Sequence, residues 1–191
     1  MDKLLLHICC APDATVALER LAGKYETTGF FYNPNVEPLP EYTLREAEAR
    51  LLASLCGVEY IEGEPARKAW LAETAPLHAE PERGQRCGVC ISHRLDITAR
   101  RAAELGFQTF TTTLTTSPHK DVYFIHEAGR RIGEKHGVLY LPETFRAKDG
   151  FRRSVELARQ YNLYRQDYCG CRWSYENSHG KPLANVEPAV A

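Results

Sequence analysis

Six of the seven cysteines in this 191-residue chain stand in three close pairs, and these pairs carry most of the chemistry that the sequence offers. The pairs are Cys9-Cys10, Cys87-x-x-Cys90 and Cys169-x-Cys171. Closely spaced thiols bind metals or perform redox chemistry, whereas cysteines that only fill a core usually occur singly. The three pairs therefore predict one sulfur-rich centre that is assembled from three distant segments.

Several kinds of centre are compatible with these pairs. Four thiols on two short turns, those of the second and third pairs, satisfy one tetrahedral zinc ion. Such a site leaves the first pair unexplained, so an iron-sulfur cluster, alone or beside a second metal, accounts for more of the thiols. A redox dithiol at Cys87 and Cys90, where the start of a helix lowers thiol pKa values, leaves the other four paired cysteines without a role.

The first pair is followed three residues later by Asp13. Because successive side chains diverge, we expect Cys9 and Cys10 to reach two neighbouring centres rather than a single ion. The Asp13 carboxylate would add a hard oxygen ligand to the centre nearer the substrate, or it would simply cap the helix that follows. The seventh cysteine, Cys56, has no nearby partner and is expected to be a small buried hydrophobe.

The elements that must position these residues alternate along the chain. Apolar, β-branched and aromatic runs predict strands at 4–8, 25–32, 58–61, 107–115 and 138–141. Helical spacing of apolar residues predicts helices after residue 12, across 44–55, from 87 to 102, over 121–136 and from 151. Across 44–55, the expected core face is Leu44, Ala47, Leu51 and Leu55. The alternation predicts an α/β fold of the Rossmann-like kind, with a parallel sheet and helices on both faces.

Functional loops of such folds leave the carboxyl ends of the strands. Cys9, Cys10 and Asp13 follow the first predicted strand, Asn33 follows the second, and the 115–119 loop with His119 follows the fourth. The sequence therefore predicts an active site at this edge of the sheet.

Length and composition restrict the class of protein. The chain suffices for one domain with its own core, and the stretch 177–191 has no periodicity and is expected to be a flexible tail. No segment is apolar enough to cross a membrane and the first residues lack a signal sequence, so we expect a cytoplasmic protein without a membrane partner. In that reducing compartment, thiols are favoured over disulfides.

Charge is unevenly distributed although the formal net charge is only −1. Residues 41–82 hold nine acidic and four basic side chains, whereas residues 145–172 hold three acidic and seven basic ones. A polyanionic partner would meet the later segment, where Arg146, Arg152 and Arg172 are candidate phosphate contacts.

Five segments together resemble the QueH-type, cobalamin-independent epoxyqueuosine reductases. They are LLHICCAP at 5–12, YNPN at 32–35, RCGVC at 86–90, TTLTTSPH at 112–119 and DYCGC at 167–171. The resemblance covers residues 3–176, and the ordered combination is far more specific than any single pair. It implies a single HUP-like catalytic domain over 1–176.

The resemblance also implies an activity and cofactors. The activity is the two-electron removal of the epoxide oxygen from epoxyqueuosine at the tRNA wobble position, which gives queuosine. The cofactors are a 4Fe-4S cluster and an adjacent mononuclear iron, and the partners are tRNA bearing epoxyqueuosine in its anticodon and an external electron donor. The implied metal ligands are Cys9, Cys10, Asp13, Cys87, Cys90, Cys169 and Cys171, and their division between cluster and iron stays open. Many relatives have a further cysteine at the position of Asp13, where a carboxylate favours a hard, Lewis-acidic iron.

We expect catalytic roles for Cys9, Asp13 and His119, with His119 as a candidate proton donor. The expected substrate contacts are Tyr32, Asn33, Arg146, Arg152 and Arg172. Two other functions compete with this one. A tRNA thiolase-like iron-sulfur enzyme would need a phosphate-cradling glycine loop after the first strand, which this chain lacks. A zinc-stabilised RNA-binding module would be colourless.

Overall fold

A computed structural model describes residues 1–184, which form one five-stranded, fully parallel sheet. Its spatial order is β3-β2-β1-β4-β5. The strands are β1 (Asp2–Ile8), β2 (Tyr25–Phe31), β3 (Glu59–Glu62), β4 (Thr109–Thr112) and β5 (Leu139–Tyr140). The order of the strands reverses between β1 and β4, and in open α/β sheets such a switch point is where ligands bind.

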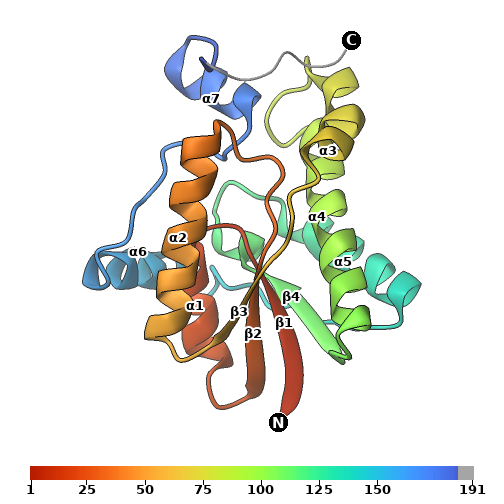
Figure 1. Ribbon diagram of the computed structural model, residues 1–191, viewed down its shortest axis with the longest axis vertical. Coiled ribbons are helices and arrows are strands. Elements are labelled where there is room, and N and C mark those ends of the chain that lie inside the picture. The colour runs from red at the N-terminus through yellow and green to blue at the C-terminus, as the bar shows by residue number, and fades with distance from the viewer. Residues whose placement is uncertain (185–191) are drawn as a thin grey trace.

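Helices cover both faces of the sheet, as the alternation predicts (Figure 1). The helices α1, α2 and α6 pack on one face, and α4 and α5 pack on the other. The helices are α1 (Ala11–Leu21), α2 (Leu39–Leu55), α3 (Arg67–Thr74), α4 (Gln85–Glu104), α5 (Val122–His136), α6 (Gly150–Gln160) and α7 (Arg172–His179), with short 3₁₀ turns η1 (Ala75–Leu77) and η2 (Thr113–Thr116). The prediction of a Rossmann-like parallel sheet is confirmed.

The continuous apolar run in β1 explains why this strand lies at the centre of the sheet. Leu4, Leu6 and Ile8 point into the core beneath α1 and α2, whereas Leu5 points into the core beneath α4 and α5. A parallel strand that is covered on both faces has no solvent side, so the apolar residues do not alternate with polar ones.

Two expectations from the sequence are wrong. The residues Leu44, Ala47, Leu51 and Leu55 lie on the exposed side of α2, and Cys56 at its end is also exposed. The helix buries the opposite side instead, with Tyr42, Arg45, Ala49, Leu52 and Ala53. The apolar pattern misleads because a buried arginine, which has its polar partners elsewhere in the chain, occupies a core position.

Further elements differ from the expectation in extent. α3 follows β3 in a stretch whose charge and proline content gave no helical pattern, and it packs against α4. The expected tail at 177–191 begins inside α7, which continues to His179, and residues 185–191 lie outside the described part of the chain. Among the described helices, none is both long and apolar enough to cross a membrane.

Candidate metal centre

The first cysteine pair and Asp13 form one compact group at the end of β1. The Cys9 Sγ atom lies 3.8 Å from the Cys10 Sγ atom and 3.6 Å from Asp13 Oδ2. The three ligand atoms all lie within 4.8 Å of one another, and no other group of three His, Cys, Asp or Glu side chains in residues 1–184 is as compact. The expectation that the two adjacent side chains diverge is therefore wrong.

Local backbone structure explains this convergence. The chain leaves β1 in a bend at Cys9, and Cys10 is the extended N-cap residue of α1, so the two side chains turn toward the first turn of the helix. Thr113, which follows β4 across the switch point, contacts Cys9 twice. Its Oγ1 accepts the Cys9 N–H at 3.0 Å and donates to the Cys9 Sγ atom at 3.1 Å.

The other four paired thiols surround a second, narrow cavity. Cys87 and Cys90 come from the first turns of α4, and Cys169 and Cys171 come from the segment that leads into α7. Cys87 and Cys169 also line the large cleft that contains Cys9 and Asp13. The three pairs therefore converge on adjoining cavities, and all seven cysteines are free thiols.

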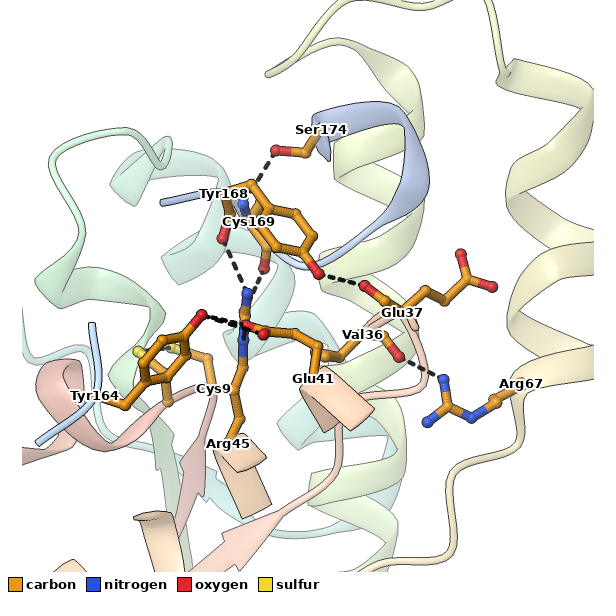
Figure 2. Close-up of polar contacts among 11 residues, drawn as sticks. Cys9, Val36, Glu37, Glu41, Arg45, Arg67, Tyr164, Tyr168, Cys169 and Ser174 are labelled. Atoms are coloured by element: carbon orange, nitrogen blue, oxygen red, sulfur yellow. Dashed lines mark hydrogen bonds and ion pairs between the residues drawn. The ribbon is translucent and has the colours of Figure 1, made fainter. Parts of the chain in front are cut away.

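The segment that carries the third pair is held in place by α2 (Figure 2). Arg45, which is only 2% exposed, donates to the carbonyls of Tyr168 at 3.2 Å and of Cys169 at 3.1 Å. Its Nε atom donates to Glu41 at 2.7 Å, and the Glu41 carboxylate also accepts from the hydroxyl of Tyr164. A buried cation from a distant helix thus positions the turn that carries Cys169 and Cys171.

Gly170 allows this turn. Its φ of +125° lies in a region that residues with a side chain rarely adopt. A Cβ atom there would also lie 3.0 Å from Val36 and 3.1 Å from the Arg45 guanidinium. Glycine between Cys169 and Cys171 is therefore required by both conformation and space.

The large cleft has a volume of about 1400 Å³ and opens over the Cys9 group. Small-molecule sites usually measure about 300–1000 Å³, so the cleft has room for a bulky substrate. His119 lies at its edge in the loop between η2 and α5, where the His119 carbonyl accepts from Arg83 Nε at 3.0 Å.

Charges around the thiols affect their protonation. Burial raises the pKa of the Asp13 carboxyl to about 6, although the hydrogen bond from Cys9 lowers this pKa. Burial likewise raises the pKa values of Cys90 and Cys171. Burial would also raise the pKa of the Cys169 thiol, but the net shift is downward because the cations Lys120 and Arg94 favour its thiolate. A bound metal cation would favour the deprotonated form of all these groups.

Other expected site residues have supporting positions. Tyr32 and Asn33 are buried, and Asn33 donates to the Ile8 carbonyl at 2.9 Å and accepts from Arg94 at 3.3 Å. These two residues fix the end of β1 to α4.

The three arginines are all engaged within the chain. Arg146 donates to the carbonyls of Ser117 and Lys120, which holds the His119 loop. Arg172 forms a two-pronged ion pair with Glu37 at 2.6 and 2.8 Å. Arg152 is mostly exposed and forms surface pairs with acidic neighbours on α6.

Three residues at the thiol cavity escape sequence reasoning, namely Trp70, Arg94 and Lys120. For Arg94 a signal exists, since it lies one helical turn after Cys90 on the same face of α4. Lys120 directly follows the predicted functional loop. Trp70 lies on the unpredicted helix α3, and its sequence context gives no signal.

The sheet topology, the switch point and the thiols define a class of protein. It is a Rossmann-like α/β protein with a cluster of cysteine thiols at the carboxyl end of the sheet. A family model described as "Epoxyqueuosine reductase QueH" matches residues 4–177, and the chain belongs to this family of oxidoreductases.

Individual relatives agree with this assignment. The chain is 38% identical over 175 residues to the epoxyqueuosine reductase QueH of Streptococcus pyogenes, covering 88% of this chain and 69% of the relative. It is 34% identical over 177 residues to that of Thermotoga maritima, covering 91% of both chains.

Two solved structures share the fold. One is described as the predicted subunit of a tRNA methyltransferase from Methanocaldococcus jannaschii, with a TM-score of 0.59, 13% identity, and coverage of 99% of this chain and 93% of that one. The other is the U34-tRNA thiolase NcsA from Methanococcus maripaludis with its [4Fe-4S] cluster, with a TM-score of 0.56, 16% identity, and coverage of 91% and 61%. At these identities the similarity concerns the fold alone.

Proposed function

We propose that the chain reduces epoxyqueuosine in the anticodon of tRNA to queuosine. The observation that carries this proposal is the convergence of three remote thiol pairs on one large cleft, in a chain that belongs to the epoxyqueuosine reductase family. The reaction breaks both C–O bonds of the epoxide and forms a C=C bond. It consumes two electrons and two protons and releases the oxygen as water. An external one-electron donor supplies the electrons.

The donor sets fit two different metal groups. In an iron-sulfur cluster, iron and sulfide atoms separate the thiolates, so its four cysteines surround a cavity rather than a point. This arrangement suits Cys87, Cys90, Cys169 and Cys171 around the narrow cavity, as ligands of a 4Fe-4S cluster. The compact Cys9, Cys10 and Asp13 group suits a single iron. When bound, the cluster supplies single electrons and the iron supplies a Lewis acid.

The side chains of the cleft have separate tasks in this proposal. His119, exposed at the edge of the cleft, gives a proton from its imidazole to the departing oxygen. Tyr32 and Asn33 do not line the cleft and act indirectly, by joining the end of β1 to His93 and Arg94 of α4. Arg152 contacts the tRNA backbone, and Arg146 and Arg172 contribute through the loops that they hold. A tRNA substrate and free thiols both suit the cytoplasm.

The thiolase-like alternative is weaker. Nucleotide-activating enzymes bind phosphate through a glycine-rich loop after the first strand. In this chain the loop after β1 is instead the Cys-Cys-Ala-Pro-Asp segment, which carries the compact group of Cys9, Cys10 and Asp13.

The test is a single reaction under anaerobic conditions. The full chain is loaded with iron and sulfide and incubated with dithionite and tRNA bearing epoxyqueuosine, and the digested nucleosides are weighed by mass spectrometry. We expect loss of one oxygen from the modified nucleoside. A chain that carries the cluster but leaves epoxyqueuosine intact contradicts the proposal.

A further inference from the structure

Three of the four thiols around the narrow cavity accept a hydrogen bond from a nitrogen atom, and the fourth, Cys90, shares the cavity with the indole of Trp70. The backbone N–H of Arg83 donates to Cys87 Sγ at 3.3 Å, and the backbone N–H of Ser174 donates to Cys171 Sγ at 3.4 Å. These two bonds arise from the loops themselves, because any residue other than proline would supply the same N–H group.

The nitrogen groups at the other two thiols, Cys169 and Cys90, belong to side chains. Lys120 Nζ lies 3.0 Å from Cys169 Sγ, in the wall between the narrow cavity and the large cleft. The indole N–H of Trp70 is buried without a hydrogen-bond partner, and Trp70 and Cys90 both line the narrow cavity.

Positive charge accumulates at the same place. Lys120 forms no ion pair with a carboxylate in the described part of the chain, and neither does the buried Arg94. One terminal nitrogen of the Arg94 guanidinium donates a hydrogen bond to Asn33 Oδ1 at 3.3 Å. The Nε atom of Arg94 is buried and has no hydrogen-bond partner. Arg86 also lines the cavity, and within residues 1–184 it donates only to backbone carbonyls. Three cations beside four thiols would compensate the negative charge of a thiolate-bound cluster.

Reduction adds one negative charge to an iron-sulfur cluster. Hydrogen bonds to its sulfur ligands and nearby cations stabilise the reduced form more than the oxidised form, and so they raise its reduction potential. We propose that Lys120 is the positioning residue that raises the reduction potential of the cluster, and that Trp70 adds a smaller contribution. This inference rests on the proposed function, because it requires the cluster.

We expect Lys120 to raise the reduction potential more than Trp70 does, for two physical reasons. It is the only donor of the four that carries a full charge, and a charge acts on the whole cluster rather than on one sulfur. Its backbone is also fixed, since the Lys120 carbonyl accepts from Arg146 at 2.9 Å. The ammonium group is therefore held against Cys169 rather than left free in the cleft.

The test is the midpoint potential of the cluster, measured by redox titration with electron paramagnetic resonance on the anaerobically loaded full chain without tRNA. Lys120→Met, which keeps the length of the side chain without the charge, should lower the midpoint potential. Lys120→Arg, which keeps charge and donor, should restore most of it. Trp70→Phe should lower it by less. Lys135→Met, at an exposed lysine paired with Asp96 at 2.7 Å, is the matched control and should leave it unchanged.

The outcomes separate this inference from the proposed function. A chain that binds no iron and sulfide contradicts the proposed function. A loaded Lys120→Met variant with the wild-type potential overturns the inference alone, even if its turnover falls, since Lys120 would then act only on the substrate. If the Lys120→Met variant binds no cluster, the midpoint potential of Trp70→Phe becomes the test. An unchanged potential in that variant would overturn the inference, and a lowered potential would support it.

Discussion

At the scale of single residues, Asp13 distinguishes the two groups of thiols. It places a carboxylate 3.6 Å from Cys9 Sγ, whereas the narrow cavity presents four thiols and no carboxylate among its described lining residues. A mixed oxygen and sulfur donor set favours a harder metal ion than an all-sulfur set does. The two donor sets therefore differ in the metal chemistry that each would favour.

Replacing Asp13 should separate these two groups experimentally. We expect Asp13→Ala to lose one iron per chain but to keep the sulfide of the cluster. Turnover should fall by more than about 100-fold, beyond what loss of an outer-shell partner of a metal usually costs. Iron and sulfide analysis with the nucleoside assay measures both effects. Cys56→Ala, at the exposed cysteine outside both cavities, is the matched control and should behave as wild type. Full turnover of Asp13→Ala would remove this carboxylate from the mechanism.

At this scale, the sequence was sufficient to identify candidate ligands but not their neighbours. The thiols and Asp13 could be found because their residue types and spacing are unusual. The convergence of Cys9 and Cys10 could not, since it depends on a bend and an N-cap that turn two successive side chains the same way. Trp70 and Lys120 were missed because an indole and an ammonium group show their role only when a distant thiol lies beside them.

At the scale of elements, α2 shows how a helix can position a cysteine turn without supplying a thiol to it. Its buried Arg45 joins Glu41 to the turn that carries Cys169 (Figure 2). The apolar pattern predicted the helix correctly and its buried face wrongly, because the pattern treats arginine as a surface residue. Burial of Arg45 is possible only since the carbonyls of a distant segment satisfy its donors.

The buried ion pair gives a stability prediction. Arg45→Met leaves Glu41 and two carbonyls without their cationic partner, so we expect a loss of about 3 kcal/mol in the free energy of unfolding. Iron retention should fall as well, because the Cys169 turn is no longer held. Arg50→Met is the matched control on the same helix. Arg50 forms an ion pair with Glu46 at the same four-residue spacing, but its side chain is 58% exposed. Its replacement should therefore lower the free energy of unfolding by less than about 1 kcal/mol. Equal losses in urea unfolding would contradict the role of Arg45.

The contact between α5 and β5 gives a pH prediction. His126 bonds to the Tyr140 hydroxyl at 3.1 Å and to Thr144 Oγ1 at 2.9 Å. Burial lowers the pKa of His126 below its ordinary 6.5, and the nearby charge of Arg130 lowers it further. The carboxylate of Glu143 raises this pKa but has a smaller effect. The unfolded chain therefore takes up a proton at a higher pH than the folded chain does. Stability from this residue is complete above about pH 6.5 and is lost as the pH falls toward the lowered folded pKa.

The measurement is urea unfolding of wild type and His126→Gln at about pH 7.5 and about pH 5.5. We expect wild type to lose more stability between the two pH values than the variant does. An identical pH dependence for both proteins would show that His126 titrates alike in the folded and unfolded chains.

At the scale of the whole molecule, the basic segment 145–172 bonds to acidic side chains from distant parts of the chain. Arg172 pairs with Glu37, Arg153 pairs with Glu19, and the Tyr164 hydroxyl donates to Glu41 on α2. The basic segment is thus partly neutralised by the chain itself. The sequence revealed the asymmetry, but only the fold shows that it joins two segments more than 100 residues apart.

The fold as a whole was predictable because the central strands are apolar in β1 and rich in threonine and aromatic residues in β2 and β4, and they alternate with amphipathic helices. Strand order, in contrast, depends on which strands pair, and no residue pattern encodes the reversal between β1 and β4. That reversal brings Thr113 against Cys9 and opens the cleft at the carboxyl end of the sheet. The position of the site at this edge was predictable from topology rules, and its division into two cavities was not.

The most direct test of the account is iron and sulfide quantitation on the full chain purified and loaded without oxygen. Three thiol pairs converging on adjoining cavities predict about five iron atoms and about four sulfides per chain, as a 4Fe-4S cluster with one further iron requires. The sample should be brown. A colourless chain that binds one zinc ion and no sulfide would contradict the account.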